Sequence, residues 1–129
     1  MKEIKFRAVR FFKDGTCDMD YSKHWKSLGE FISFLEVNYR NNHKLLAYTG
    51  LKDKNGTEIY EGDIVIAWSA GVKAICEVKW GQGRAGFFLY RKPNIAWNLS
   101  GGGKDYNEEN VEVIGNIYEH PHLLGGEEE

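Results

Sequence analysis

The dipeptide Asn55-Gly56 is the strongest local constraint on how this chain can fold. A two-residue type I′ turn needs positive φ at both central positions, which asparagine and glycine adopt at the least cost. Two antiparallel strands should therefore meet here. Strand-forming residues follow at 59–60, then a second turn at Glu61-Gly62-Asp63 and an apolar β-branched run, Ile64–Trp68, typical of a buried strand. The stretch from residue 48 to 68 thus predicts a compact β unit.

The turns of this stretch contain carboxylates whose presence local turn chemistry explains. Asp53 can accept hydrogen bonds from backbone amides of the Asn-Gly turn, and Asp63 can brace the corner after Gly62. With Glu58 and Glu61 nearby, the acids could instead divide acid and base roles or hold Mg²⁺. We expect the structural role. The positions of this structural signature are Gly50, Asp53, Asn55, Gly56, Tyr60, Gly62 and Asp63.

The runs Tyr48–Gly56 and Glu58–Val65 resemble the signature of the YopX family, small proteins found in bacteriophages and prophages. The opening Lys2–Ala8 resembles that family's N-terminus. The run Val113–Glu119, followed by Pro121, resembles its C-terminal close. The resemblance therefore spans nearly the whole chain.

Two positions depart from the family pattern. Val9 stands where an aromatic residue is more usual, and His120 stands where asparagine usually precedes the proline. The resemblance implies phage or prophage origin, a cytoplasmic location in the bacterial host cell and a mostly β fold. It implies no assigned reaction and no catalytic residues.

Length and composition are those of a globular protein. The 129 residues suit a single domain, 1–129, in which 1–47 and 48–124 could form subdomains. The apolar fraction of 42% and the aromatic fraction of 14% are too high for a disordered chain. A net charge of −2 argues against a general nucleic-acid or membrane binder.

The two cysteines, Cys17 and Cys76, lack the paired spacing of a zinc or redox motif. No signal peptide or long apolar span is evident, so we expect a cytoplasmic protein that does not enter a membrane. In a reducing compartment both thiols are expected to act as small apolar core residues.

Alternation near the N-terminus predicts a first strand. Ile4, Phe6 and Ala8 should face the core while Lys5 and Arg7 face water. The dipeptide Asp14-Gly15 then predicts a hairpin turn, after which the residues from Cys17 to Tyr21 should return as a short strand.

One helix is predicted from Ser27, whose hydroxyl can cap the first turn while Glu30 completes a capping box. We expect it to end at Arg40-Asn41-Asn42. Its apolar stripe should pack on the sheet and consists of Leu28, Phe31, Ile32, Leu35 and Tyr39.

The second half of the chain reads as further strands. In the strand 74–80 the buried face should comprise Ala74, Cys76, Val78 and Trp80. We expect further strands at 87–90, 95–99 and 111–118, a mobile loop at 100–107, a short helix after Pro121 and a flexible acidic tail at 125–129. The fold class is therefore α+β, mainly β: a bent antiparallel sheet or open SH3-like barrel with one packed amphipathic helix.

The run Gly81–Gly86 matches the spacing of a dinucleotide-binding motif. That motif needs a following helix to receive the pyrophosphate, whereas the residues at 87–90 predict a strand. We therefore expect a hairpin loop and no cofactor.

Basic and aromatic residues recur between positions 80 and 92. A β surface of this kind could bind single-stranded nucleic acid. The candidate binding surface consists of Trp80, Arg84, Tyr90, Arg91 and Lys92. The pair His120 and His122 offers too few ligands for a fixed metal site, so no metal is expected.

The function favoured by the sequence is that of a noncatalytic phage or prophage accessory protein of unknown biochemical role. It would act by binding or by self-assembly as a homo-oligomer, through edge strands or exposed aromatic residues. The partner would be a phage protein, a host protein or a nucleic acid. Two alternatives are a nucleic-acid-binding module that uses the candidate binding surface, and a metal-dependent hydrolase that uses the signature carboxylates.

Overall fold

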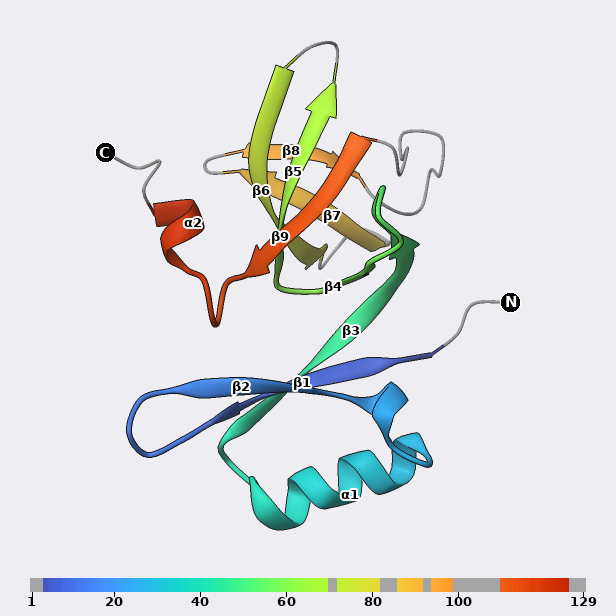
Figure 1. Ribbon diagram of the computed structural model, residues 1–129, viewed down its shortest axis with the longest axis vertical. Helices are drawn as coiled ribbons and strands as arrows, with labels where there is room; N and C mark the ends of the chain where they lie inside the picture. Colours follow the sequence, from blue (N-terminus) through green and yellow to red (C-terminus); the bar gives the residue numbers. More distant parts are fainter. Residues whose placement is uncertain (1–3, 70–71, 82–85, 92–93, 99–109, 126–129) are drawn as a thin grey trace. The chain divides into compact units, whose positions relative to one another are not determined.

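The computed structural model describes residues 4–69, 72–81, 86–91, 94–98 and 110–125 (Figure 1). The chain divides into two compact units, Met1–Tyr48 and Thr49–Glu129. Strand β3 (His43–Lys52) contains the boundary between them. The strands form two sheets, with orders β2-β1-β3-β4 and β8-β7-β6-β5-β9.

The first unit contains β1 (Phe6–Phe11), β2 (Cys17–Tyr21), the 3₁₀ helix η1 (Ser22–His24) and α1 (Leu28–Asn38). Strand β1 pairs antiparallel with both β2 and β3.

The predicted first hairpin and its return strand are confirmed. The Phe12 amide donates to the Thr16 carbonyl at 2.9 Å, and the Gly15 amide donates to the Phe12 carbonyl at 3.0 Å. Gly15 has a φ of 91°, so the loop is a turn closed by a left-handed glycine.

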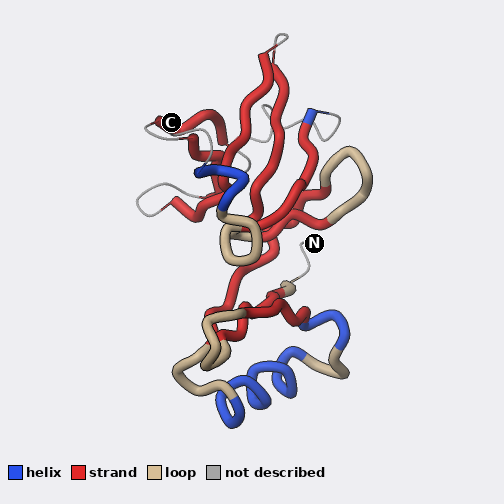
Figure 2. Tube along the Cα trace, turned by 60° about the vertical axis from the view of Figure 1, so that its left-hand side comes forward, coloured by secondary structure: helices blue, strands red, loops and turns tan. Residues whose placement is uncertain are grey.

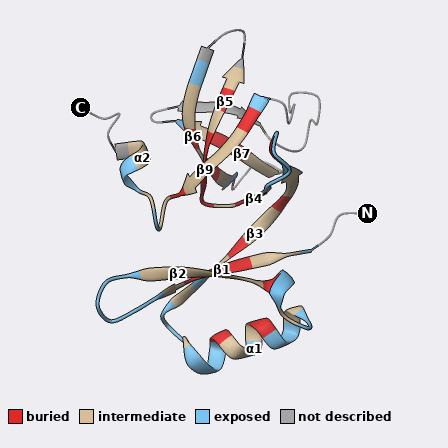
Figure 3. Cartoon of the chain, viewed as in Figure 1, coloured by how far each residue is buried: buried red, intermediate tan, exposed pale blue. Residues whose placement is uncertain are grey.

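Helix α1 begins where the sequence predicts, because the Ser27 hydroxyl accepts from the Glu30 amide at 3.1 Å. Its buried residues lie on the side of the helix that faces the sheet (Figure 3). The predicted stripe is confirmed. The cluster around it comprises Phe6, Ala8, Trp25, Leu28, Phe31, Ile32, Phe34, Leu35, Tyr39 and Leu45.

The predicted end of the helix is wrong by a few residues. The last helical residue is Asn38, and Tyr39 leaves the helix with φ −135° and ψ 36°. The Tyr39 carbonyl accepts from the Asn42 amide at 2.9 Å and from His43 Nδ1 at 2.7 Å. Bonds from residues beyond the helix thus replace the next helical turn.

The predicted faces of β1 are partly wrong. Phe6 and Ala8 pack with α1 as expected, but Ile4 lies before the strand and is 76% exposed. Arg7 is only 3% exposed, and its Nη1 donates to the Tyr21 hydroxyl at 3.4 Å. A long arginine stem can be buried when its guanidinium finds polar and aromatic partners.

The second unit is built mainly from strands (Figure 2). After the end of β3 come β4 (Glu58–Tyr60) and five further strands, and the short helix α2 (His122–Gly125) closes it. The five are β5 (Asp63–Ser69), β6 (Val72–Gly81), β7 (Gly86–Arg91), β8 (Asn94–Asn98) and β9 (Val111–Asn116).

This five-stranded antiparallel sheet curls into a half-barrel (Figure 1). The mainly β fold class with one packed helix is confirmed, while the likeness to SH3 barrels stays a prediction. The predicted loop at 100–107 and most of the tail lie outside the described residues.

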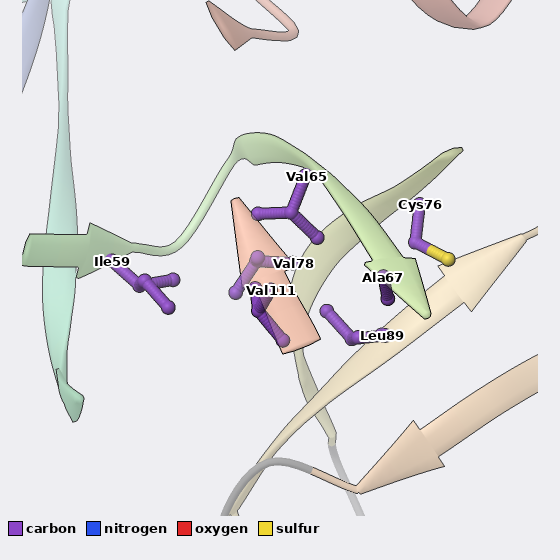
Figure 4. Close-up of a cluster of buried hydrophobic side chains, with 7 residues drawn as sticks. All are labelled: Ile59, Val65, Ala67, Cys76, Val78, Leu89 and Val111. Atoms are coloured by element: carbon purple, nitrogen blue, oxygen red, sulfur yellow. The ribbon is translucent and has the colours of Figure 1, made fainter. Parts of the chain in front are cut away.

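The core of the second unit lies on the inner side of the curled sheet. Seven buried side chains make it up (Figure 4): Ile59, Val65, Ala67, Cys76, Val78, Leu89 and Val111. Leu51, Ala74, Phe87 and Val113 pack against them. Most of this cluster comes from every second residue along β5, β6 and β7, because successive side chains of a strand point to opposite faces of the sheet.

None of the helices in the described part of the chain combines the length and the apolar character needed to cross a bilayer.

Candidate functional site

The turn that contains Asn55 and Gly56 has three loop residues, so the predicted two-residue type I′ turn is wrong. The Gly56 amide donates to the Asp53 carbonyl at 3.0 Å, and the Asp53 amide donates to the Thr57 carbonyl at 2.9 Å. Lys54 and Asn55 therefore occupy the centre, and Gly56 follows with a φ of 81°. This is the three-residue hairpin loop in which the glycine forms a bulge.

The Asp53 carboxylate explains this longer loop. Its side chain is buried, with 1% of the residue exposed. Oδ1 accepts from the amides of Asn55 and Thr57, both at 2.9 Å, as turn chemistry predicts. Oδ2 accepts from the Val113 amide of β9 at 2.8 Å, a contact across 60 positions. The carboxylate thus fixes both the turn and its attachment to β9.

A further backbone bond supports this attachment, since the Lys54 amide donates to the Val111 carbonyl at 3.0 Å. The outer edge of β9 is therefore occupied by the turn at both Val111 and Val113. An edge strand covered in this way is less available for pairing with another chain.

The corner between β4 and β5 is braced in a similar way. Asp63 is buried and its Oδ2 accepts from the Tyr60 amide at 2.8 Å. Gly62, with φ of 90°, donates its amide to the Val78 carbonyl and accepts from the Ile117 amide, both at 2.9 Å. A side chain at Gly62 would be strained in this backbone conformation.

The other signature residues also make local contacts. The Tyr60 hydroxyl donates to Glu58 Oε1 at 3.1 Å. Gly50 has a φ of 90° within β3, and the neighbouring Thr49 hydroxyl donates to the Ile59 carbonyl at 2.8 Å. These contacts join β3 to β4 around the braced turn.

The described signature acids do not form a metal site. Within the ranges that the structure describes, no three His, Cys, Asp or Glu side chains gather closely enough to hold a metal ion. Asp53 and Asp63 instead accept hydrogen bonds from the backbone at separate turns. Each of these two carboxylates therefore stabilises its own turn.

The candidate binding surface is not one continuous face. Strands β6 and β7 pair Trp80 with Phe87 and Glu77 with Tyr90. Because successive residues of a strand point to opposite faces, Trp80 and Tyr90 lie on opposite sides of the sheet, and Arg91 shares the side of Trp80. The remaining two members, Arg84 and Lys92, lie outside the described residues.

The predicted burial of Trp80 is wrong, because the residue is 51% exposed. The buried cluster ends at Val78 and Leu89, one cross-strand pair before Trp80. The Trp80 ring contacts that of Phe87, with centroids 4.9 Å apart and planes at 71°. Phe87 is half-buried against the core cluster, whereas Trp80 is exposed, so the Trp80 ring is a candidate contact site.

Two residues near this surface were missed by the sequence reasoning, Phe87 and Lys79. Lys79 Nζ lies 4.9 Å from the centroid of the Tyr90 ring, on the opposite side of the sheet from Trp80. Counting outward from the hairpin between Gly81 and Gly86 would have placed Phe87 opposite Trp80. The hairpin itself is confirmed, since these glycines pair and β7 follows where a nucleotide-binding motif needs a helix.

The geometry of His120 disfavours metal binding. Its Nδ1 accepts from the Asn116 amide at 3.2 Å, so in the neutral ring the hydrogen is on Nε2. Neither nitrogen then offers a lone pair to a metal. The His122 ring lies 6.3 Å from the His120 ring, centroid to centroid.

Both cysteines are free thiols. Burial in the core raises the pKa of Cys76 to about 11, against a smaller lowering effect of the Arg91 charge. A thiol with this pKa is protonated and unreactive at neutral pH.

Solved structures resemble this chain over nearly its whole length. Protein EF1440 from Enterococcus faecalis is 25% identical, with 96% of this chain and 99% of that chain covered and a TM-score of 0.51. Protein yopX from Bacillus subtilis is 18% identical, with 93% and 97% covered and a TM-score of 0.46.

No curated protein matches the sequence. The model of the YopX family, described as YopX protein, matches residues 5–125. The chain therefore belongs to the YopX family.

Proposed function

We propose that this YopX-family protein is a noncatalytic accessory protein of a bacteriophage or prophage. It acts in the host cytoplasm by binding a partner or a second copy of itself. The observation that carries this proposal is the use of the Asp53 carboxylate, whose two oxygens accept three backbone amide hydrogens. A carboxylate engaged in this way is a poor general base and a poor metal ligand.

The exposed Trp80 ring, which contacts the half-buried Phe87, is the contact that we assign to binding. Tryptophan and tyrosine are enriched at the centres of protein interfaces, where a large aromatic area is buried at a small entropic cost. Strand edges offer a second mode of contact. The strands at the ends of the two sheets are β2, β4, β8 and β9. The braced turn covers β9, so β2, β4 and β8 are the candidates for pairing with a partner strand.

Calorimetric titration with Mg²⁺, Mn²⁺ and Zn²⁺ tests whether the protein is a metal-dependent hydrolase. We expect no binding heat from the wild-type chain. The control carries Glu58→Gln and Glu61→Gln, which remove acidic charge and leave Asp53 and Asp63 in place. A binding isotherm in the wild type would overturn the noncatalytic proposal, and its persistence or loss in the Glu58→Gln and Glu61→Gln variant would tell whether the two aspartates or the two glutamates hold the metal.

Sedimentation velocity over micromolar concentrations tests self-association through the aromatic pair. If a second copy is the partner, the wild type should form a larger species and Trp80→Ser should return it to monomer. The matched control is Val37→Ser, because Val37 is another exposed apolar residue, on α1. A monomeric wild type would leave a heterologous partner as the only binding mode.

Nucleic-acid binding is the second candidate, supported by Trp80 and Arg91 on one side of the sheet. Fluorescence anisotropy with a labelled single-stranded oligonucleotide should show weaker binding for Trp80→Ala and for Arg91→Ala. Tyr90→Ala, on the opposite side, should bind as the wild type does. Binding that does not weaken as salt rises would contradict this candidate, because phosphate contacts release counterions.

A further inference from the structure

The corner after β9 is held by a dense set of hydrogen bonds. The buried Asn116 accepts through Oδ1 from the amides of Tyr118 at 3.0 Å and Glu119 at 2.8 Å. Its Nδ2 donates to Glu119 Oε1 at 2.9 Å, and its carbonyl accepts from the His120 amide at 2.8 Å. This corner sets the position from which α2 begins.

The His120 ring sits directly over Gly115. A Cβ at Gly115 would lie 2.7 Å from His120 Nδ1 and 2.9 Å from Leu123 Cδ1, so both side chains occupy the space above the glycine. Helix α2 continues from this point, with the Leu123 amide donating to the His120 carbonyl at 3.0 Å. The imidazole and α2 therefore dock together.

This docking covers the face of the sheet that is opposite the core. Ile64 pairs with Gly115 on one side and with Glu77 on the other, so all three share a face. The neighbouring Val65 and Val113 belong to the core cluster on the other face. Ile64 has no exposed surface although it points away from that cluster. Helix α2 lies close to β6, and its Leu123 lies over Gly115, the cross-strand partner of Ile64 on this outer face.

We infer that α2 docks on the sheet only while His120 is neutral, and that protonation of its ring releases the helix and exposes the apolar surface at Ile64. The Asn116 amide points a hydrogen at His120 Nδ1, which must be a lone pair. In an imidazolium both ring nitrogens carry hydrogen, so two N–H groups would face each other at this position. Histidine is the side chain that changes charge between about pH 5 and 8.

Charged side chains near His120 have opposing effects on a positive charge at its ring. Lys79 on β6 and a protonated His122 would oppose a charge on His120, whereas the acids would favour it. The decisive contact is the one at hydrogen-bonding distance, 3.2 Å from the Asn116 amide. The acids that share this outer face are Glu77 on β6 and Glu112 on β9, and Glu119 lies in the corner.

Hydrogen exchange of the full chain, read by mass spectrometry over the peptide 116–125, tests this inference. After correction for intrinsic exchange rates, we expect roughly tenfold faster exchange at the acidic end of the histidine range than at its alkaline end, from the loss of one hydrogen bond. His120→Gln offers an acceptor that does not titrate, so its exchange should not depend on pH. His122→Gln is the control and should keep the wild-type response.

A wild-type peptide with the same corrected exchange rate at both ends of that range would overturn the inference. So would a His120→Gln variant that keeps the wild-type pH response. If His120→Gln fails to dock at any pH, ¹⁵N NMR of the wild-type imidazole decides. If the neutral ring, at the alkaline end of the pH range, has its hydrogen on Nε2 and none on Nδ1, the inference is supported. The opposite tautomer contradicts it.

Discussion

Replacing Asp53 by alanine removes the acceptor of three backbone amides that are held at 2.8 to 2.9 Å. Bonds to a charged group contribute about 1.5–3 kcal/mol each, and a buried donor left without an acceptor costs about 1–3 kcal/mol. The turn residues Asn55 and Thr57 are exposed, so water can partly replace two of these bonds. The Val113 amide is less accessible. We therefore expect Asp53→Ala to lower the free energy of unfolding by about 3–5 kcal/mol.

Asp53→Asn separates the two functions of this carboxylate. The amide oxygen can still accept from the turn, but the amide nitrogen would then face the Val113 N–H, donor against donor. The variant should keep the turn and lose the attachment to β9, at a cost of about 2–3 kcal/mol. Its loss should thus be smaller than that of Asp53→Ala.

Urea unfolding followed by tryptophan fluorescence and circular dichroism measures both losses. The control is Asp14→Ala in the first hairpin. Asp14 is fully exposed, and its Oδ1 accepts from the hydroxyl and the amide of Thr16 in the same loop, which lowers its pKa. Its removal should leave the midpoint of the second unit unchanged. If Asp53→Ala unfolds within about 0.5 kcal/mol of the wild type, the bracing role that we assign to this residue is refuted.

Four further predictions concern stability and reactivity. Gly29→Ala should raise the melting temperature, by about 0.5–1 kcal/mol of added stability, because a Cβ there would meet nothing closer than 3.9 Å and alanine favours the helix. Gly115→Ala should lower the free energy of unfolding by about 1–3 kcal/mol in a urea titration, because its Cβ would displace His120. Iodoacetamide should label Cys17 before Cys76 in the native protein. Burial raises the pKa of Cys76 from 9.0 to about 11, so the stability gained by keeping this thiol protonated is fully present below pH 9 and is lost as the pH rises to 11. Urea titrations at alkaline pH measure this loss.

Local rules predicted the elements whose causes lie within a few residues. Helix α1 follows from the cap at Ser27 and the spacing of its apolar stripe, both of which can be read from a dozen positions. The end of that helix was missed because it is set by His43, which bonds to the Tyr39 carbonyl from the next strand. Contacts from outside an element move its boundary, and a pattern within the element cannot reveal them.

The braced turn shows the same limit. Asn55 and Gly56 located the turn, but its length depends on Asp53, whose second oxygen binds Val113 far along the chain.

Trp80 shows a related limit. Alternation assigned it to the core face correctly, yet the core ends one pair earlier, and alternation alone carries no information on where a sheet stops being covered.

These contacts explain why the most recognisable part of the chain says little about its action. The turn at Asp53 and the corner at Asp63 join β3, β4, β5 and β9, so substitutions there report on folding. The features that we assign to function are the Trp80–Phe87 pair and the ring of His120, which lie outside that stretch. Because Trp80 is largely exposed, its replacement should leave the fold intact while binding is lost, a separation that no substitution at Asp53 can give.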